Sequence, residues 1–272
     1  MNKNRPAFRK YISSFIVLIL ISGGLQAFAL TNSQGAFAAT GDSGSIQFNG
    51  TNQYGLISSP NSAFGLGTAD FTIEFWWYAT ANDRRFDILD FWNPSATNMT
   101  RLDIGYAITG NIELYTDNYC SINSGENPTV NQWTHIALTR SSGTLYFWVN
   151  GVERGSISCN KDFGSAGYSL SMMKDHGANR FVPGNLTNIR VVKNNAVYTS
   201  AFTPSTSPLG KVSGTSFLLS AIDGDLLKDS SDNNVAVTAP NGALFSSTSP
   251  FPLSAPNISS ATISGNPIYG DV

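Results

Sequence analysis

Apolar and polar residues alternate over most of the chain, and this pattern predicts β-strands. The clearest case is residues 71–78, where Phe71, Ile73, Phe75 and Trp77 fall on one face and the four residues between and after them fall on the other. Successive side chains of a strand point to opposite faces, so a period of two is typical of a strand with one face in the core. Similar runs, bounded by Gly, Asn and Pro, cover 85–91, 100–107, 110–116, 133–140, 143–152, 168–172, 185–193, 216–221, 234–238 and 242–246.

Helical periodicity is nearly absent between Ser45 and Phe245. The pair Asn150-Gly151 ends one strand and predicts a hairpin, because both residues tolerate positive φ. About a dozen short strands without helices to cover a sheet predict an all-β sandwich or barrel.

The first 38 residues have the order of a secretory signal peptide, with a basic start, an apolar core and small residues at the end. The apolar core, 11–21, is too short for the ~20 residues of a spanning helix. Cleavage after Ala38 or after Ala29 fits the pattern, and we favour Ala38. The basic residues of this leader are Lys3, Arg5, Arg9 and Lys10.

Removal of the leader makes the protein acidic. Of 16 basic residues, four lie in the leader, which leaves 12 against 18 acidic residues and a net charge near −6. No basic stripe remains, so we expect no nucleic-acid partner. No later stretch is apolar enough to predict a membrane span, so we expect a secreted or cell-surface protein.

The chain has two cysteines, Cys120 and Cys159. In an oxidising compartment an even count predicts a disulfide between them. Two buried free thiols are the alternative.

Several segments, in this order and spacing, resemble the laminin-G-like, concanavalin A-like lectin/glucanase jelly-roll family, in the variant found in microbial and phage surface proteins. The resemblance covers 43–253 and implies a two-sheet antiparallel jelly-roll sandwich. Residues 254–272 resemble the first strand of a bacterial Ig-like repeat, so we expect a linker or the start of a truncated repeat there. The matching segments are 45–54, 70–76, 132–140 (QWTHIALTR), 145–151 (LYFWVNG), 184–191, 196–199, 202–204, 217–219, 228–231 and 249–251.

Glucanases of this fold carry paired carboxylates on one strand, where residues two apart share a face. The four glutamates here have no such partner, so the glucanase motif is missing. The two histidines also lack the order that a chymotrypsin-like triad would need. We therefore expect no enzyme, and a glycoside hydrolase ranks a distant third among the candidate functions. The glutamates are Glu74, Glu113, Glu126 and Glu153.

The resemblance also allows for Ca²⁺, which prefers several oxygen ligands. Loop residues offer such oxygens without a contiguous ligand motif, so no metal ligand is assigned. His135 and His176 are isolated and form no zinc spacing. The loop candidates are Asp83, Asp87, Asp90, Asn98, Asp117 and Asn118.

Sugar-binding sites stack an aromatic ring on the sugar and surround it with polar groups. Trp92 at a strand end, and Tyr115 beside Asp117 and Asn118, are the predicted ligand-binding residues. The resemblance implies an extracellular, non-catalytic binding or adhesion module for a glycan or cell-surface component. The alternative is a structural spacer of a multidomain surface protein that binds no small ligand.

Overall fold

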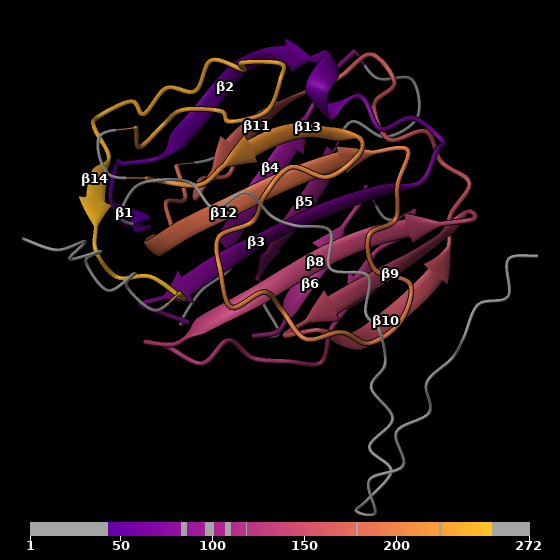
Figure 1. The fold of residues 1–272 in the computed structure, drawn as a ribbon, viewed down its shortest axis with the longest axis horizontal. Coiled ribbons are helices and arrows are strands. Elements are labelled where there is room, and N and C mark those ends of the chain that lie inside the picture. The colour runs from indigo at the N-terminus through magenta and orange to yellow at the C-terminus, as the bar shows by residue number, and fades with distance from the viewer. Residues whose placement is uncertain are drawn as a thin grey trace, which may run out of the picture. The chain divides into compact units, whose positions relative to one another are not determined.

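The computed structural model describes residues 43–82, 86–95, 101–106, 110–117, 119–177, 179–222 and 225–251. The predicted leader, the predicted 254–272 tail and Asn118 lie outside the described residues. The described chain forms two packed antiparallel β-sheets (Figure 1). This confirms the predicted all-β sandwich.

One sheet has eight strands and the other has six, and every pairing between neighbours is antiparallel. In the eight-stranded sheet the order is β10 (Val152–Ser158), β9 (Thr144–Val149), β8 (Trp133–Ser141), β3 (Phe71–Ala79), β12 (Pro183–Lys193), β1 (Ser45–Asn49) and β14 (Leu244–Ser246), and β13 (Thr215–Leu219) pairs with β12. In the six-stranded sheet the order is β2 (Gly55–Asn61), β11 (Tyr168–Met172), β4 (Phe86–Trp92), β5 (Arg101–Tyr106), β6 (Ile112–Tyr115) and β7 (Ile122–Asn123). A 3₁₀ turn, η1 (Ser62–Phe64), follows β2.

The strand prediction is wrong in a few places. Strands β2 and β7 were not predicted, and the predicted hairpin left the extent of its second strand, β10, open. Strand β7 has only two residues, and β10 is a largely exposed, polar edge strand. The predicted strand at 234–238 forms only isolated bridges, from Ala236 to Lys228 and from Thr238 to Leu56.

The core lies between the sheets. The four apolar residues of β3 that the alternation predicts to face inward are all fully buried. Opposite them, the six-stranded sheet contributes Leu89, Phe91, Leu102, Ile104 and Leu170, also fully buried. Burial of each such side chain contributes about 1.5–3 kcal/mol.

A loop covers the outer face of the eight-stranded sheet. The hydroxyl of Thr72 donates to the carbonyl of Asn195, and the ring of Phe202 stacks on Tyr198 at 3.6 Å. Phe202 also lies 5.7 Å from the ring of Trp148, which is fully buried. The outer face of β9 is therefore buried at Trp148, although the alternation of the strand alone would place this side chain in solvent.

The Asn150-Gly151 turn confirms the predicted hairpin between β9 and β10. Both residues have positive φ, 52° and 77°. A Cβ on Gly151 would lie 1.8 Å from the carbonyl oxygen of Phe202. Glycine is needed here both for the turn and for the close approach of the covering loop.

Cys120 and Cys159 form the predicted disulfide. Cys120 lies between β6 and β7, and Cys159 follows β10, so the bond joins an edge of the six-stranded sheet to an edge of the eight-stranded one. Closing a loop of this length contributes roughly 4 kcal/mol in the chain-entropy estimate. No helix in the described part of the chain is long and apolar enough to cross a membrane.

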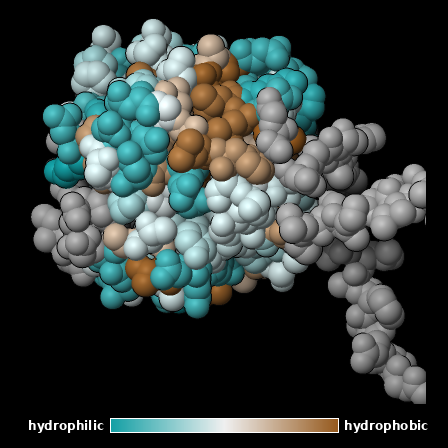
Figure 2. Space-filling model, turned by 90° about the vertical axis from the view of Figure 1, so that its left-hand side faces the viewer, coloured by the Kyte–Doolittle hydropathy of each residue, from teal (hydrophilic) through white to brown (hydrophobic). Residues whose placement is uncertain are grey.

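The side of the molecule with β14 carries an apolar patch among hydrophilic residues (Figure 2). Strand β14 ends the eight-stranded sheet, and its Leu244 is 57% exposed.

A buried ionic cluster holds the middle of the eight-stranded sheet. The carboxylate of Glu74 accepts hydrogen bonds from Arg190 Nε at 2.9 Å and from the hydroxyl of Tyr198 at 2.8 Å, and lies 3.2 Å from Nε2 of His135. Burial alone would raise the pKa of Glu74, but Arg190, His135 and Tyr198 together lower it to about 2. The ionised form of Glu74 is thus favoured in the folded state.

This cluster predicts an acid-dependent stability. A carboxyl whose pKa falls from 4.5 to about 2 on folding stabilises the protein above pH 4.5, and the contribution is lost as the pH falls toward 2. The loss is on the order of 3 kcal/mol. Urea unfolding from pH 6 to pH 2 should show this slope in the unmodified chain and a shallower one in Glu74→Gln. The half-exposed Glu126→Gln is the control, and equal slopes for all three proteins would refute the assignment.

Candidate functional site

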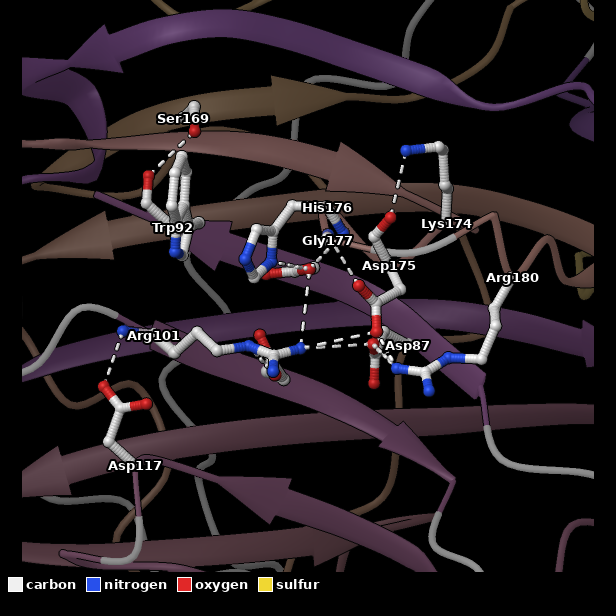
Figure 3. A network of polar contacts seen from close by, with 12 residues as sticks. Asp87, Trp92, Arg101, Asp117, Ser169, Lys174, Asp175, His176, Gly177 and Arg180 are labelled. Carbon is white, nitrogen blue, oxygen red and sulfur yellow. Dashed lines mark hydrogen bonds and ion pairs between the residues drawn. The ribbon is translucent and has the colours of Figure 1, made fainter. Parts of the chain in front are cut away.

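A network of charged and aromatic side chains lies on the outer face of the six-stranded sheet, over β4 and β5 (Figure 3). A bulge between Asp87 and Leu89 turns Ile88 and Leu89 both into the core. We define the β4–β5 site by its residues, which are Asp87, Asp90, Trp92, Arg101, Asp103, Asp175, His176 and Arg180.

Strand register brings the first members together. Asp90 pairs directly with Asp103, and Trp92 pairs with Arg101. Residues directly opposite each other in an antiparallel pair have their side chains on the same face, close enough to interact. Two carboxylates, one guanidinium and one indole therefore share one small area of the sheet.

Arg101 is the centre of the network. Its Nε lies 2.6 Å from Asp103 Oδ2, and its Nη2 lies 3.3 Å from Asp87 Oδ2, 3.7 Å from Asp90 Oδ2 and 3.8 Å from Asp175 Oδ2. Burial would lower the pKa of Arg101, but the neighbouring aspartates raise it. A single guanidinium thus compensates carboxylates from two strands and one loop.

The loop after β11 packs over β4 and contributes Asp175 and His176 to the site. The backbone N–H of Met173 donates to the carbonyl of Ile88, which fixes the start of the loop on β4. The backbone N–H of His176 donates to Asp90 Oδ2 at 2.7 Å, and its ring Nδ1 lies 2.6 Å from the same oxygen. Asp175 accepts from the N–H of Gly177 at 2.7 Å and forms an ion pair with Arg180.

Trp92 and His176 form an aromatic shelf. Their rings stack with centroids 4.5 Å apart and planes 21° from parallel. Trp92 is half-buried, and its backbone carbonyl accepts from the hydroxyl of Ser169. The hydrogen bonds of His176 to Asp90 therefore also hold the indole in place.

The two paired carboxyls differ in acidity. Burial would raise the pKa of Asp90, but hydrogen bonds from His176 and with Asp103 hold it below its usual value. Burial, together with the charges of Asp90 and Asp87, raises the pKa of Asp103 well above its usual value. The pair therefore favours holding one shared proton.

Three of the predicted ligand-binding residues lie around Arg101. Trp92 lies opposite Arg101 in the strand pair. The Arg101 guanidinium lies 5.7 Å from the ring centre of Tyr115, and the Arg101 backbone N–H donates to Asp117 at 3.0 Å. Asn118 is outside the described residues. Sequence reasoning missed Arg101, Asp103, Asp175, His176 and Arg180. Arg101 and Asp103 are two residues apart in a predicted strand and so share a face, which could have indicated a charged cluster there. The loop residues follow no such pattern.

The only group of His, Cys, Asp and Glu side chains in the described chain that could hold a metal is Asp90, Asp175 and His176, with ligand atoms within 4.8 Å of one another. Calcium takes six to eight oxygen ligands. This group supplies an imidazole and is flanked by guanidinium groups, so it does not fit calcium. Asp87 and Asp90, considered as loop ligands, lie in β4 instead. Calcium binding stays a prediction without assigned residues.

The network predicts a large cost for loss of the Arg101 guanidinium. Arg101→Met leaves buried carboxylates without their counter-charge, which should lower the free energy of unfolding by about 3–5 kcal/mol. Arg154→Met is the control, because Arg154 and Glu126 form a partly exposed ion pair at 2.8 Å that should contribute about 1 kcal/mol or less. Urea unfolding at pH 7 measures both, and equal effects would contradict the central place of Arg101.

Comparison with solved structures shows the fold. A candidate carbohydrate-binding protein from Bacteroides ovatus matches with a TM-score of 0.52 and 15% identity over 75% of this chain, which spans 60% of that protein. A heptameric SAP-like pentraxin from Limulus polyphemus matches with a TM-score of 0.53 and 15% identity over 75% of this chain and 95% of its own. No curated protein sequence matches significantly.

A family model settles the relationship at the level of sequence. Laminin_G_3, described as the concanavalin A-like lectin/glucanases superfamily, matches residues 30–200, more than half of the chain. The predicted family resemblance is thereby confirmed for the segments up to residue 200. The chain belongs to this concanavalin A-like lectin/glucanase family.

Proposed function

We propose that the protein is an extracellular, non-catalytic binding module that recognises a glycan through the β4–β5 site. The observation that carries the proposal is the shelf of Trp92 on His176, which offers a ring face held in a fixed orientation. A sugar ring stacks on such a surface with little loss of side-chain freedom, because the indole is already fixed.

The groups around the shelf suit hydroxyl recognition. The side chains of Arg101, His176 and Arg180 are 18%, 20% and 41% exposed, so their N–H groups can reach a ligand. The carboxylates beneath them are almost fully buried and hold the guanidinium groups in place. A ligand would therefore meet oriented donors, with the carboxylates acting through them.

One structural relative and the disulfide support this proposal. The Bacteroides ovatus protein carries carbohydrate binding in its name, and the same fold carries the β4–β5 site here. The Cys120–Cys159 bond fits an oxidising compartment such as the cell surface. Calcium assistance, which the family resemblance suggested, is a separate part of the proposal.

Two alternatives to glycan binding are a structural spacer and a glycoside hydrolase. A spacer without a small ligand would leave the shelf without a role, and the binding test below decides between the two. A glycoside hydrolase draws support from one feature, the Asp90–Asp103 pair with acidities pushed apart. However, these side chains are 0% and 2% exposed and lie beneath Arg101, where a glycosidic oxygen could not reach them. Binding is the better account.

The proposal predicts that Trp92→Ala strongly weakens glycan binding. Removal of a central tryptophan from a binding site costs about 2 kcal/mol, roughly a 30-fold loss of affinity. The measurement is a glycan array probed with the full chain, with and without calcium, followed by titration of the best glycan.

Leu244→Ala is the matched control, because it removes exposed apolar surface from the other sheet. It should bind as the unmodified chain does. A blank array in both conditions would favour the spacer, and equal binding by Trp92→Ala and the control would place the site elsewhere. Release of reducing sugar from a bound glycan would instead support the glycoside hydrolase alternative.

A further inference from the structure

We infer that the β4–β5 site prefers acidic oligosaccharides to neutral ones and binds the anionic group of the ligand at Arg180. Such a preference presupposes the glycan site proposed above and gives the charge class of its ligand. A carboxylate or a sulfate would supply the anionic group. Arg180 lies between β11 and β12, and Figure 3 shows Arg180 and Trp92 at opposite ends of the network.

The charged side chains of this site are layered, with guanidinium groups toward solvent and carboxylates beneath them. The side chains of Arg101 and Arg180 are 18% and 41% exposed. The carboxylate side chains are at most 4% exposed, and they belong to Asp87, Asp90, Asp103 and Asp175. An anionic ligand would therefore contact N–H donors, whereas the carboxylates would lie farther from it and repel it less.

The charges of the site also balance, so an anion is not repelled by a net negative charge. Asp90 and Asp103 favour one shared proton, which leaves three negative charges on the four aspartates. Arg101 and Arg180 carry two positive charges. The third is the ammonium of Lys174, which a backbone carbonyl holds in the same loop as Arg180. Because the guanidinium groups lie nearer to solvent than the carboxylates, the field at the surface of the site favours an anion.

Arg180 keeps donors for a ligand. Its Nη2 forms the ion pair with Asp175 and lies 3.8 Å from Asp87 Oδ2. Its Nε and Nη1 have no hydrogen-bond acceptor among the described residues. In Figure 3 the second terminal nitrogen of Arg180 points away from the aspartates. A hydrogen bond from a guanidinium N–H to an anionic oxygen is roughly twice as strong as a neutral one, so these donors favour an anionic group.

The dimensions of the site indicate an oligosaccharide. Arg180 lies beside Asp87, which precedes Trp92 by five residues in β4. At a rise of about 3.3 Å per strand residue, and with one residue taken up by the bulge, the two positions are about 13–16 Å apart. A sugar ring on Trp92 and an anionic group at Arg180 therefore belong to different units of one ligand, which would pass over Arg101.

An array of matched pairs, probed with the full chain, tests this preference. The acidic probes are hyaluronan, alginate, pectin and carrageenan oligosaccharides, each beside its carboxyl-reduced or desulfated form. Titration calorimetry on the best pair should show at least about 10-fold tighter binding of the acidic form, which is the lower value for one hydrogen bond to a charged group. Raising NaCl from about 50 mM to about 500 mM should reduce this difference, because salt screens charges that reach solvent. The carboxylated and sulfated arms tell which anionic group is bound.

Arg180→Gln should remove the preference, with an affinity about 10-fold lower for the acidic form and unchanged for its neutral partner. Arg154→Gln is the matched control and should keep the preference, because it removes a partly exposed arginine from β10 in the other sheet. Circular dichroism checks that each variant is folded. If Arg180→Gln does not fold, the matched pairs and the salt dependence of the unmodified chain decide.

Three results would overturn the preference for acidic ligands. An unchanged preference in folded Arg180→Gln would show that Arg180 does not bind the anionic group. Equal or tighter binding of the neutral partners, still weakened by Trp92→Ala, would refute the charge class and leave the glycan site in place. A blank array would refute both the charge class and the glycan site.

Discussion

The ion pairs of Arg101 are the interaction on which the rest of the candidate site depends. Four buried carboxylates in one area of a sheet would repel one another strongly and would each lose the hydration of bulk water. The Arg101 guanidinium lies within 3.8 Å of all four, on the strand next to the one that carries Asp87 and Asp90. It thereby permits Asp90 to hold His176, and His176 to support Trp92.

The two outer faces of the sandwich are used differently. On the eight-stranded sheet, the loop with Tyr198 and Phe202 covers Glu74 and Trp148, and the buried charges there are matched by Arg190. On the six-stranded sheet, the loop after β11 covers the carboxylates and leaves Trp92, Arg101 and Arg180 partly exposed. The first face is covered by a loop that leaves a pocket beside Arg190 and Tyr198, whereas the other face ends in a shelf surrounded by donors. This difference is the physical reason for placing function on the six-stranded sheet.

Much of the fold could be predicted from the sequence, because alternation in strands such as β3 records which face is buried. The hairpin at Asn150-Gly151 and the disulfide also follow from local chemistry and cysteine count. The extent of the polar edge strand β10 could not be predicted, because the strand buries little and so carries no apolar period. The exposure of Trp148 could not be predicted either, because a covering loop distant in sequence decides whether its side chain is solvated.

The candidate site was only half predictable. Trp92, Tyr115 and Asp117 were chosen for their chemistry, and all three contact or face Arg101. The contribution of Asp175 and His176 depends on a loop 85 residues beyond Asp90 in the chain, and the sequence between them does not indicate that they meet. Spacing rules made His176 an isolated residue, whereas its ring lies against two residues of β4, Asp90 and Trp92.

The central claim is that ligands bind at the Trp92 shelf, and the five indole N–H signals in a ¹H–¹⁵N spectrum test it most directly. Trp76, Trp77, Trp133 and Trp148 all lie in the eight-stranded sheet and serve as internal references. On titration with the glycan that binds best, the account predicts a progressive shift of the Trp92 signal while the other four stay in place. An unchanged Trp92 signal at saturation, with shifts at Trp76 or Trp133, would contradict it.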